Sequence, residues 1–120
     1  MIGQRATSPT TSPTYVLYRE NITAADAGPY TTYRSGLTMD GHARALIQLV
    51  PKTGTGNPVA KIYYWSNGAG KYVLAESGPA AAGAGVATEF TVNCYGRQMF
   101  VEITGTLTGG VDVYVSGYPV

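Results

Sequence analysis

The sequence predicts an all-β domain, a single antiparallel β-sandwich of about eight strands with a jelly-roll-like arrangement. Short runs rich in β-branched and aromatic residues recur along the chain at the spacing typical of sandwiches. Each run is bounded by glycine, proline or asparagine, which favour turns. The length of 120 residues, of which 44% are hydrophobic, suits one domain with one core. The predicted strands are 15–20, 30–34, 43–51, 59–66, 71–77, 86–94, 98–104 and 110–116.

The segments between these strands are rich in turn-forming residues. Glycines at 54–58 and 67–70 tolerate a positive φ and allow the chain to reverse. Segment 78–85 is rich in alanine, but its glycines and Pro79 favour a surface loop over a helix. A single helical turn is expected at 24–27.

Residues 1–14 differ in composition from the rest of the chain. They contain Pro9 and Pro13 among serines and threonines, and they carry little that a core would bury. We therefore predict an extended N-terminal arm over 1–14 and a β-sandwich domain over 15–120. Two interpretations of the arm stay open: a terminus without contacts, or a segment that lies along a neighbouring subunit.

Alternation in the last two predicted strands indicates which side chains face the core. The inward-facing residues are Met99, Val101, Ile103, Val111, Val113 and Val115. If these two strands formed a hairpin, Glu102 would lie opposite Asp112, and the like charges would repel each other. A different register, placement in different sheets and a bridging cation are the alternatives. We favour different sheets, as in a jelly roll.

The stretch 59–77 predicts a β-hairpin whose turn at 67–70 places Ser66 opposite Lys71. Both faces of this hairpin are largely apolar, although the outer face of a sandwich is usually polar. A cover is therefore expected over the outer face, supplied by the chain's own loops or by another protein. The first face carries Lys61, Tyr63, Trp65, Tyr72, Leu74 and Glu76, with Lys61 opposite Glu76, and the second carries Ala60, Ile62, Tyr64, Val73 and Ala75.

Four residues of the first face are the candidate interface: Tyr63, Trp65, Tyr72 and Leu74. Aromatic side chains of this kind dominate the energetics of protein interfaces. The same side chains would also suit a hydrophobic core, and an aromatic platform can stack on sugar rings. The sequence leaves these three interpretations open.

The residues that catalysis requires are scarce, since the chain has one histidine, one cysteine and seven carboxylates. A dyad of Cys94 and His42, oriented by Asp40, is one conceivable arrangement, but Cys94 follows an alternating strand in which a small thiol is normally buried. Asp40 and His42 have no further histidine or cysteine pair at zinc spacing. We predict no catalytic, cofactor-binding or metal-ligating residues, and hence a protein that is not an enzyme.

Charged residues make up only 12% of the chain, against roughly 25% in an average protein, and the net charge is +1. Eight basic residues against seven acidic ones give no electrostatic footprint for nucleic acid. The apolar runs are too short to cross a membrane, and the N-terminus lacks the apolar stretch of a secretion signal. Such sparse charge does little to keep molecules apart, which favours a homo-oligomer. The alternative is that short β domains are simply rich in threonine and glycine.

The Ser/Thr/Pro-rich arm, the short strands, the sparse charge and the segments FVEIT (100–104) and GVDVYVSG (110–117) together resemble the small β-sandwich accessory proteins of tailed bacteriophage particles. The resemblance implies a capsid decoration or cement protein of the virion, made in the host cytoplasm. Such a protein binds the major capsid protein or another virion protein as an oligomer, without a cofactor. The alternative is a carbohydrate- or receptor-binding β-sandwich module of a phage tail or fibre, in which Tyr63, Trp65 and Tyr72 stack on sugar rings.

Overall fold

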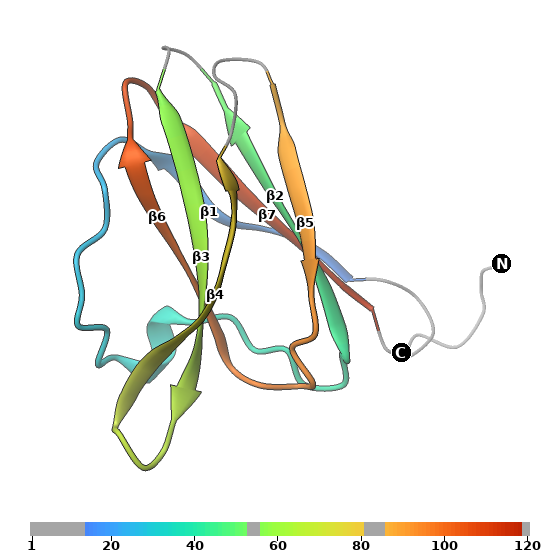
Figure 1. The fold of residues 1–120 in the computed structure, drawn as a ribbon. Helices are drawn as coiled ribbons and strands as arrows, with labels where there is room; N and C mark the ends of the chain where they lie inside the picture. Colours follow the sequence, from blue (N-terminus) through green and yellow to red (C-terminus); the bar gives the residue numbers. More distant parts are fainter. Residues whose placement is uncertain (1–13, 53–55, 81–85, 119–120) are drawn as a thin grey trace, which may run out of the picture.

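The computed structural model describes residues 14–52, 56–80 and 86–118. In these residues the chain forms two packed antiparallel sheets, so the predicted β-sandwich is confirmed (Figure 1). Sheet A has the strand order β1-β7-β2-β5, and sheet B has the order β4-β3-β6. The strands are β1 (Thr14–Ile22), β2 (Arg44–Pro51), β3 (Asn57–Ser66), β4 (Lys71–Ala80), β5 (Thr88–Val92), β6 (Met99–Thr106) and β7 (Val111–Tyr118). Apart from Thr14, the predicted arm lies outside the described residues.

Alternating side chains form the core between the two sheets. In β2 every second residue is buried, and β3 shows the same period of two. The six predicted core residues of the last two strands are all at most 2% exposed, which confirms the assignment. The largest fully buried side chains include Ile47, Leu49, Ile62, Met99 and Ile103.

The last two strands lie in different sheets, as predicted from the repulsion between Glu102 and Asp112. Glu102 lies opposite Lys61 of β3 in sheet B. Asp112 is in sheet A, where it accepts a hydrogen bond of 2.8 Å from the backbone N–H of Asn21 and forms an ion pair of 3.7 Å with Lys52. The two carboxylates are therefore in separate sheets, and Asp112 has favourable partners of its own.

The strand order is that of a jelly roll in which the edge position beside β6 is filled by an irregular segment, residues 23–43. Figure 1 shows this segment running along β6 before it enters β2. The backbone N–H of Asp26 donates to Ile103 O at 2.9 Å, and Leu37 exchanges two hydrogen bonds with Met99, of 2.6 and 3.0 Å. The segment thus binds both ends of the β6 edge without forming a strand.

The predicted strand at 30–34 is wrong. The described structure has a 3-10 turn there, η2 (Tyr33–Ser35). Pro29 has no amide hydrogen and cannot donate to a ladder. The carbonyl of Tyr30 instead accepts a hydrogen bond of 2.9 Å from the backbone N–H of Tyr72, on the β4 edge. The segment therefore crosses the outer face of sheet B rather than extending its edge.

The predicted helical turn at 24–27 is also wrong, since no helix is assigned there. The backbone N–H and the carboxylate of Asp26 both bind the backbone of Ile103, which holds the chain extended at this point. Strand β4 is longer than predicted and continues through Pro79 to Ala80, because an edge strand tolerates proline. The rest of the loop predicted over 78–85 lies outside the described residues.

The hairpin of β3 and β4 has the predicted register at its tip, with Ser66 opposite Lys71 and Trp65 opposite Tyr72. The predicted pair of Lys61 and Glu76 is wrong. An irregularity after Leu74 shifts the register, so that Glu76 lies opposite Ile62 and on the face that points to the core. The extra residue in β4 carries the glutamate from one face of the sheet to the other.

Candidate functional site

Six aromatic side chains form a cluster on the outer face of sheet B, here called the aromatic cluster. Neighbouring rings have their centroids 4.5 to 6.4 Å apart, mostly in edge-to-face geometry. Tyr30 and Tyr33 come from the segment 23–43 and lie against rings of the sheet. The segment 23–43, here called the covering segment, therefore supplies a cover over the apolar outer face. The members are Tyr30, Tyr33, Tyr63, Trp65, Tyr72 and Phe100.

A carboxylate, Glu102, lies inside this aromatic surface and is 5% exposed. It accepts hydrogen bonds from the hydroxyl of Tyr30 and, at 3.0 Å, from the hydroxyl of Tyr63. Burial raises the pKa of both tyrosines, and the hydrogen bonds to Glu102 raise it further. Both hydroxyls therefore keep their protons and act as donors. The carboxylate thereby ties the covering segment to the sheet.

A second set of polar contacts completes the outer edge of β6. The carboxylate of Asp26 accepts two hydrogen bonds from the guanidinium of Arg19, at 2.6 and 2.9 Å, and one of 2.7 Å from the N–H of Ile103. The guanidinium also donates to Val101 O at 3.1 Å and lies 5.5 Å from the centroid of the Phe100 ring. The side chains of Arg19 and Asp26 thus form hydrogen bonds with backbone groups of β6 that would otherwise pair with an additional strand.

A groove of about 360 Å³ lies between the covering segment and β4, and we call it the tyrosine groove. Its size is at the lower end of the range for ligand sites. It contains three of the four predicted interface residues, whereas Trp65 is not among its lining residues and packs against Tyr33 and Tyr72. The groove is lined by Gly28, Pro29, Tyr30, Tyr63, Lys71, Tyr72, Val73 and Leu74.

The lining residues differ greatly in their exposure. Leu74 is 51% exposed and Val73 is 44% exposed, but Tyr72 is only 3% exposed. Val73 is open because the tip of the hairpin extends beyond the two packed sheets (Figure 1). Two adjacent apolar side chains on opposite faces of an edge strand are therefore available for contact, while Tyr72 is packed within the chain. That this surface is an interface stays a prediction.

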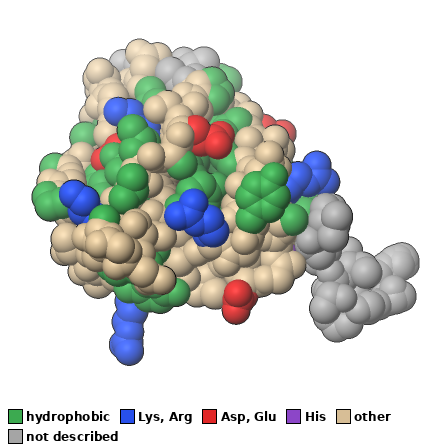
Figure 2. Space-filling model, turned by 60° about the horizontal axis from the view of Figure 1, so that its bottom comes forward, with side chains coloured by type: hydrophobic (Ala, Val, Ile, Leu, Met, Phe, Trp, Pro, Cys, Tyr) green, Lys and Arg blue, Asp and Glu red, His purple; other side chains and the backbone are tan. Residues whose placement is uncertain are grey.

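The tyrosines of the groove direct their hydroxyl groups into the protein. Tyr30 and Tyr63 donate to Glu102, and the hydroxyl of Tyr72 donates to Tyr33 O at 2.5 Å. The groove consequently offers ring surface, with Lys71 as the one charged residue of its lining. At this end of the molecule, hydrophobic side chains alternate with charged ones that stand singly (Figure 2). Such a surface suits an uncharged, apolar segment.

The sequence did not indicate the part of the groove that comes from 28–30. Tyr30 and Glu102 are 72 residues apart, and no local pattern connects them. For Glu102 the sequence predicted only that its charge should lie away from that of Asp112. The one local signal was the excess of apolar residues on the outer face of the hairpin, which correctly indicated a cover.

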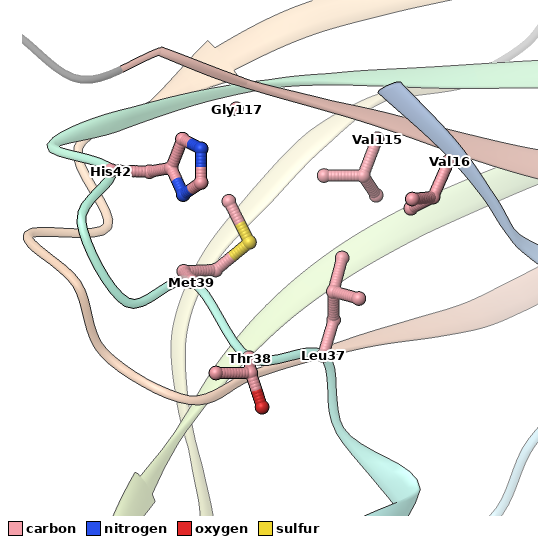
Figure 3. Close-up of a pocket in the computed structure, with 7 residues that line it drawn as sticks. All are labelled: Val16, Leu37, Thr38, Met39, His42, Val115 and Gly117. Atoms are coloured by element: carbon pink, nitrogen blue, oxygen red, sulfur yellow. The ribbon is translucent and has the colours of Figure 1, made fainter. Parts of the chain in front are cut away.

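A smaller cavity of about 70 Å³ lies between sheet A and the segment before β2 (Figure 3). In Figure 3 the side chain of Leu37 points toward Val16 and Val115, and that of Met39 rises on the side of His42. His42 packs against Gly117, where an added Cβ would lie 2.7 Å from the imidazole Cδ2. The volume admits only a few atoms. The cavity is lined by Val16, Leu37, Thr38, Met39, His42, Val115 and Gly117.

The contact between Cys94 and His42 in the structure is one with the backbone of His42. Cys94 is fully buried, and its thiol donates to the backbone carbonyl of His42 at 3.3 Å. Burial raises the pKa of Cys94, which keeps it as the thiol. Asp40 is exposed. Within the described ranges, no three side chains of His, Cys, Asp or Glu gather as potential metal ligands. In the same ranges, no helix has the length and apolarity to span a membrane.

Fold and site together define a jelly-roll-like β-sandwich with an aromatic groove on its three-stranded sheet. The chain matches no protein-family model and no curated protein. Its fold is similar to the crystal structure of the SPBc2 prophage-derived protein YomS, with a TM-score of 0.58 and 13% sequence identity. The similarity covers 88% of this chain and 92% of that chain. The two proteins therefore share a fold over nearly their whole lengths.

Raising the pH from about 10 to 12 is expected to destabilise the domain strongly. Burial raises the pKa of Tyr64 to about 12, whereas a tyrosine in an unfolded chain ionises near about 10. The folded state keeps a proton that the unfolded chain releases, so this stability is complete below about pH 10 and is lost as the pH rises through about 12. Urea denaturation at about pH 8, 10 and 11 measures the loss. The Tyr64→Phe variant should show a shallower pH dependence, and an equal dependence in both proteins would contradict the assignment.

Proposed function

We propose that this chain is a virion structural protein, a capsid decoration or cement protein that binds and stabilises the major capsid protein lattice. The observation that carries the proposal is the shared fold with a prophage-derived protein over 88% of the chain. The Ser/Thr/Pro-rich arm and the closing strands, which resemble phage accessory proteins, point in the same direction. In this role the chain works by contact alone, as a homo-oligomer without catalysis or a cofactor.

The surface of the domain supports a role in assembly. A net charge of +1 with only 12% charged residues gives little repulsion between neighbouring copies. The apolar side chains of Val73 and Leu74 stand open beside the tyrosine groove. Strands β1, β5 and β4 lie at the edges of their sheets, and edge strands can pair with other chains. On a repeating lattice, many weak contacts of this kind add up to firm attachment.

The second candidate is a carbohydrate- or receptor-binding module of a phage tail or fibre. The observation in its favour is the groove itself, in which the partly exposed rings of Tyr30 and Tyr63 would stack on sugars. A sugar site also needs polar groups that fix the hydroxyls of the ligand. The hydroxyls of Tyr30, Tyr63 and Tyr72 are already bound within the chain, so the groove favours an apolar protein segment over a sugar.

The test uses virions of the phage or prophage that encodes the chain. Purified particles are analysed by quantitative mass spectrometry, and particles from a deletion strain are compared with them for release of DNA on heating. We expect the chain in stoichiometric amounts relative to the major capsid protein, and deletion particles that form but release their DNA at lower temperature. Loss of adsorption with unchanged thermal stability would identify the receptor-binding module instead. Absence of the chain from purified particles would overturn both candidates.

A further inference from the structure

The tyrosine groove is lined mainly by aromatic and apolar side chains. We propose that it binds the segment around Pro9 and Pro13 of a second copy, so that neighbouring copies are joined by their N-terminal arms. The inference rests on the proposed function, because it takes the groove as an assembly interface. It adds which segment binds in the groove. Three observations support it: the chemistry of the groove, the composition of the arm, and the place where the arm joins the domain.

The chemistry of the groove matches a proline-containing segment. Aromatic-lined grooves bind extended proline-rich segments, because proline rings pack flat against aromatic rings and the segment is already stiff. Prolines also lack an amide hydrogen, so they need no acceptor from the groove. The tyrosine hydroxyls are engaged within the chain, and Tyr72 is buried. The contact surface is therefore made by the ring faces of Tyr30 and Tyr63 together with Pro29 and Leu74. Lys71 can donate to a carbonyl of the bound segment.

The arm has the matching composition. Residues 6–14 read ATSPTTSPT and contain no charged residue, so they bring no charge into the groove. Their prolines supply apolar rings, and their serines and threonines stay compatible with water on the outward side. No other two prolines in the sequence occur as close together. The arm is therefore the segment of this chain best suited to the groove.

The attachment point of the arm favours a second copy over the same copy. The arm joins at Thr14, the first residue of β1, an edge strand of sheet A. Arg19 of β1 contacts β6, and Gly78 of β4 lies against Phe90 of β5. Strands β1 and β4 are thus at diagonally opposite corners of the sandwich.

The distance around the domain exceeds the reach of the prolines. With strands about 4.8 Å apart and sheets about 10 Å apart, a path over the surface from β1 to the outer side of β4 measures more than about 20 Å. Pro9 precedes Thr14 by five residues and reaches at most about 17 Å, and Pro13 reaches about 3.5 Å. The proline segment therefore meets the groove of a neighbour more readily than its own.

Sedimentation velocity on the full chain tests the inference, with three variants. The double variant Pro9→Ala/Pro13→Ala removes the rings, and Leu74→Glu places a charge at the rim of the groove. Leu17→Glu is the matched control, since Leu17 is also an exposed leucine on a strand, at 41% against 51% for Leu74. We expect an oligomer that the first two variants weaken by roughly tenfold or more in dissociation constant, with the control unchanged. Thermal melting verifies that all variants are folded.

A cross-linking experiment identifies the partner segment directly. A photo-reactive residue replaces Thr11, and nitrogen-14 and nitrogen-15 preparations are mixed before irradiation. We expect cross-links to the peptide containing 71–74 that join chains of different isotope. Cross-links within one isotope only, cross-links to other surfaces only, or a monomer that none of the variants changes would each overturn the inference. These measurements use purified protein, so a chain absent from virions refutes the proposed function while leaving the arm exchange to be judged on its own results.

Discussion

Replacing Asp26 with alanine is expected to lower the free energy of unfolding by about 3 kcal/mol, because it leaves the guanidinium of Arg19 without its carboxylate partner. The same change removes the acceptor for the backbone N–H of Ile103 at the edge of β6. Both side chains are mostly buried, with 24% of Arg19 and 14% of Asp26 exposed, so water replaces the lost contacts only in part. Guanidinium denaturation of the full chain measures the change.

Asp40→Ala is the matched control, since Asp40 is an exposed acid in the same connecting segment. Its substitution should change the free energy of unfolding by less than about 0.5 kcal/mol. Hydrogen exchange adds a local readout, because the N–H of Ile103 should lose protection in the Asp26 variant. Equal stabilities of the two variants would show that the contacts of Asp26 do not hold the edge of β6.

Replacing Glu102 with alanine is expected to lower the free energy of unfolding by about 3 kcal/mol as well. The hydroxyls of Tyr30 and Tyr63 lose their common acceptor, and each buried donor left without a partner costs about 1–3 kcal/mol. The truncation also leaves a void beside the aromatic rings. Guanidinium denaturation gives the magnitude, and near-ultraviolet circular dichroism reports on the packing of the aromatic cluster.

Two further substitutions separate the hydrogen bonds from the charge. Glu102→Gln keeps an acceptor oxygen and should cost only about 1 kcal/mol. Glu89→Ala removes an exposed carboxylate that accepts from Gln48, and it should cost less than about 0.5 kcal/mol. If Glu102→Ala were no more harmful than Glu89→Ala, the covering segment would be held by packing of the rings rather than by the carboxylate.

Both predictions concern the attachment of the segment 23–43, which decides whether the tyrosine groove exists. One wall of the groove consists of Gly28, Pro29 and Tyr30, and these residues keep their place through Asp26 on one side and Glu102 on the other. The exposed residues of β4 form the opposite wall. Loss of either anchor should therefore weaken the binding of a partner segment in proportion to the fraction of molecules in which the wall has moved.

Gly36 shows how closely the covering segment fits the sheet. A Cβ added there would lie 1.9 Å from the hydroxyl oxygen of Tyr72 and 2.9 Å from the carbonyl oxygen of Met99. Only glycine allows the chain to pass this close to both strands on its return to β6. The hydroxyl of Tyr72 is then in place to donate to Tyr33 O, and this hydrogen bond joins β4 to the covering segment.

The sequence by itself determined the features that depend on neighbouring residues. Alternation placed Met99 and Val111 in the core, the turn at 67–70 set the register of Ser66 and Lys71, and the charges of the last two strands indicated separate sheets. Each of these features follows from a period of two or from a short turn, and both are encoded locally. The apolar outer face of the hairpin likewise indicated a cover and gave three of the groove residues.

The tertiary structure decided what depends on partners far apart in the chain. Residues 30–34 have the composition of a strand, yet Tyr30 binds Glu102 and Tyr72, which lie 72 and 42 positions further along the sequence. The shift that places Glu76 opposite Ile62 depends on the pairing of β4 with β3, which no local pattern specifies. Local preference is weak compared with several long-range hydrogen bonds and ring contacts, so packing overrode it in the segment that builds the groove.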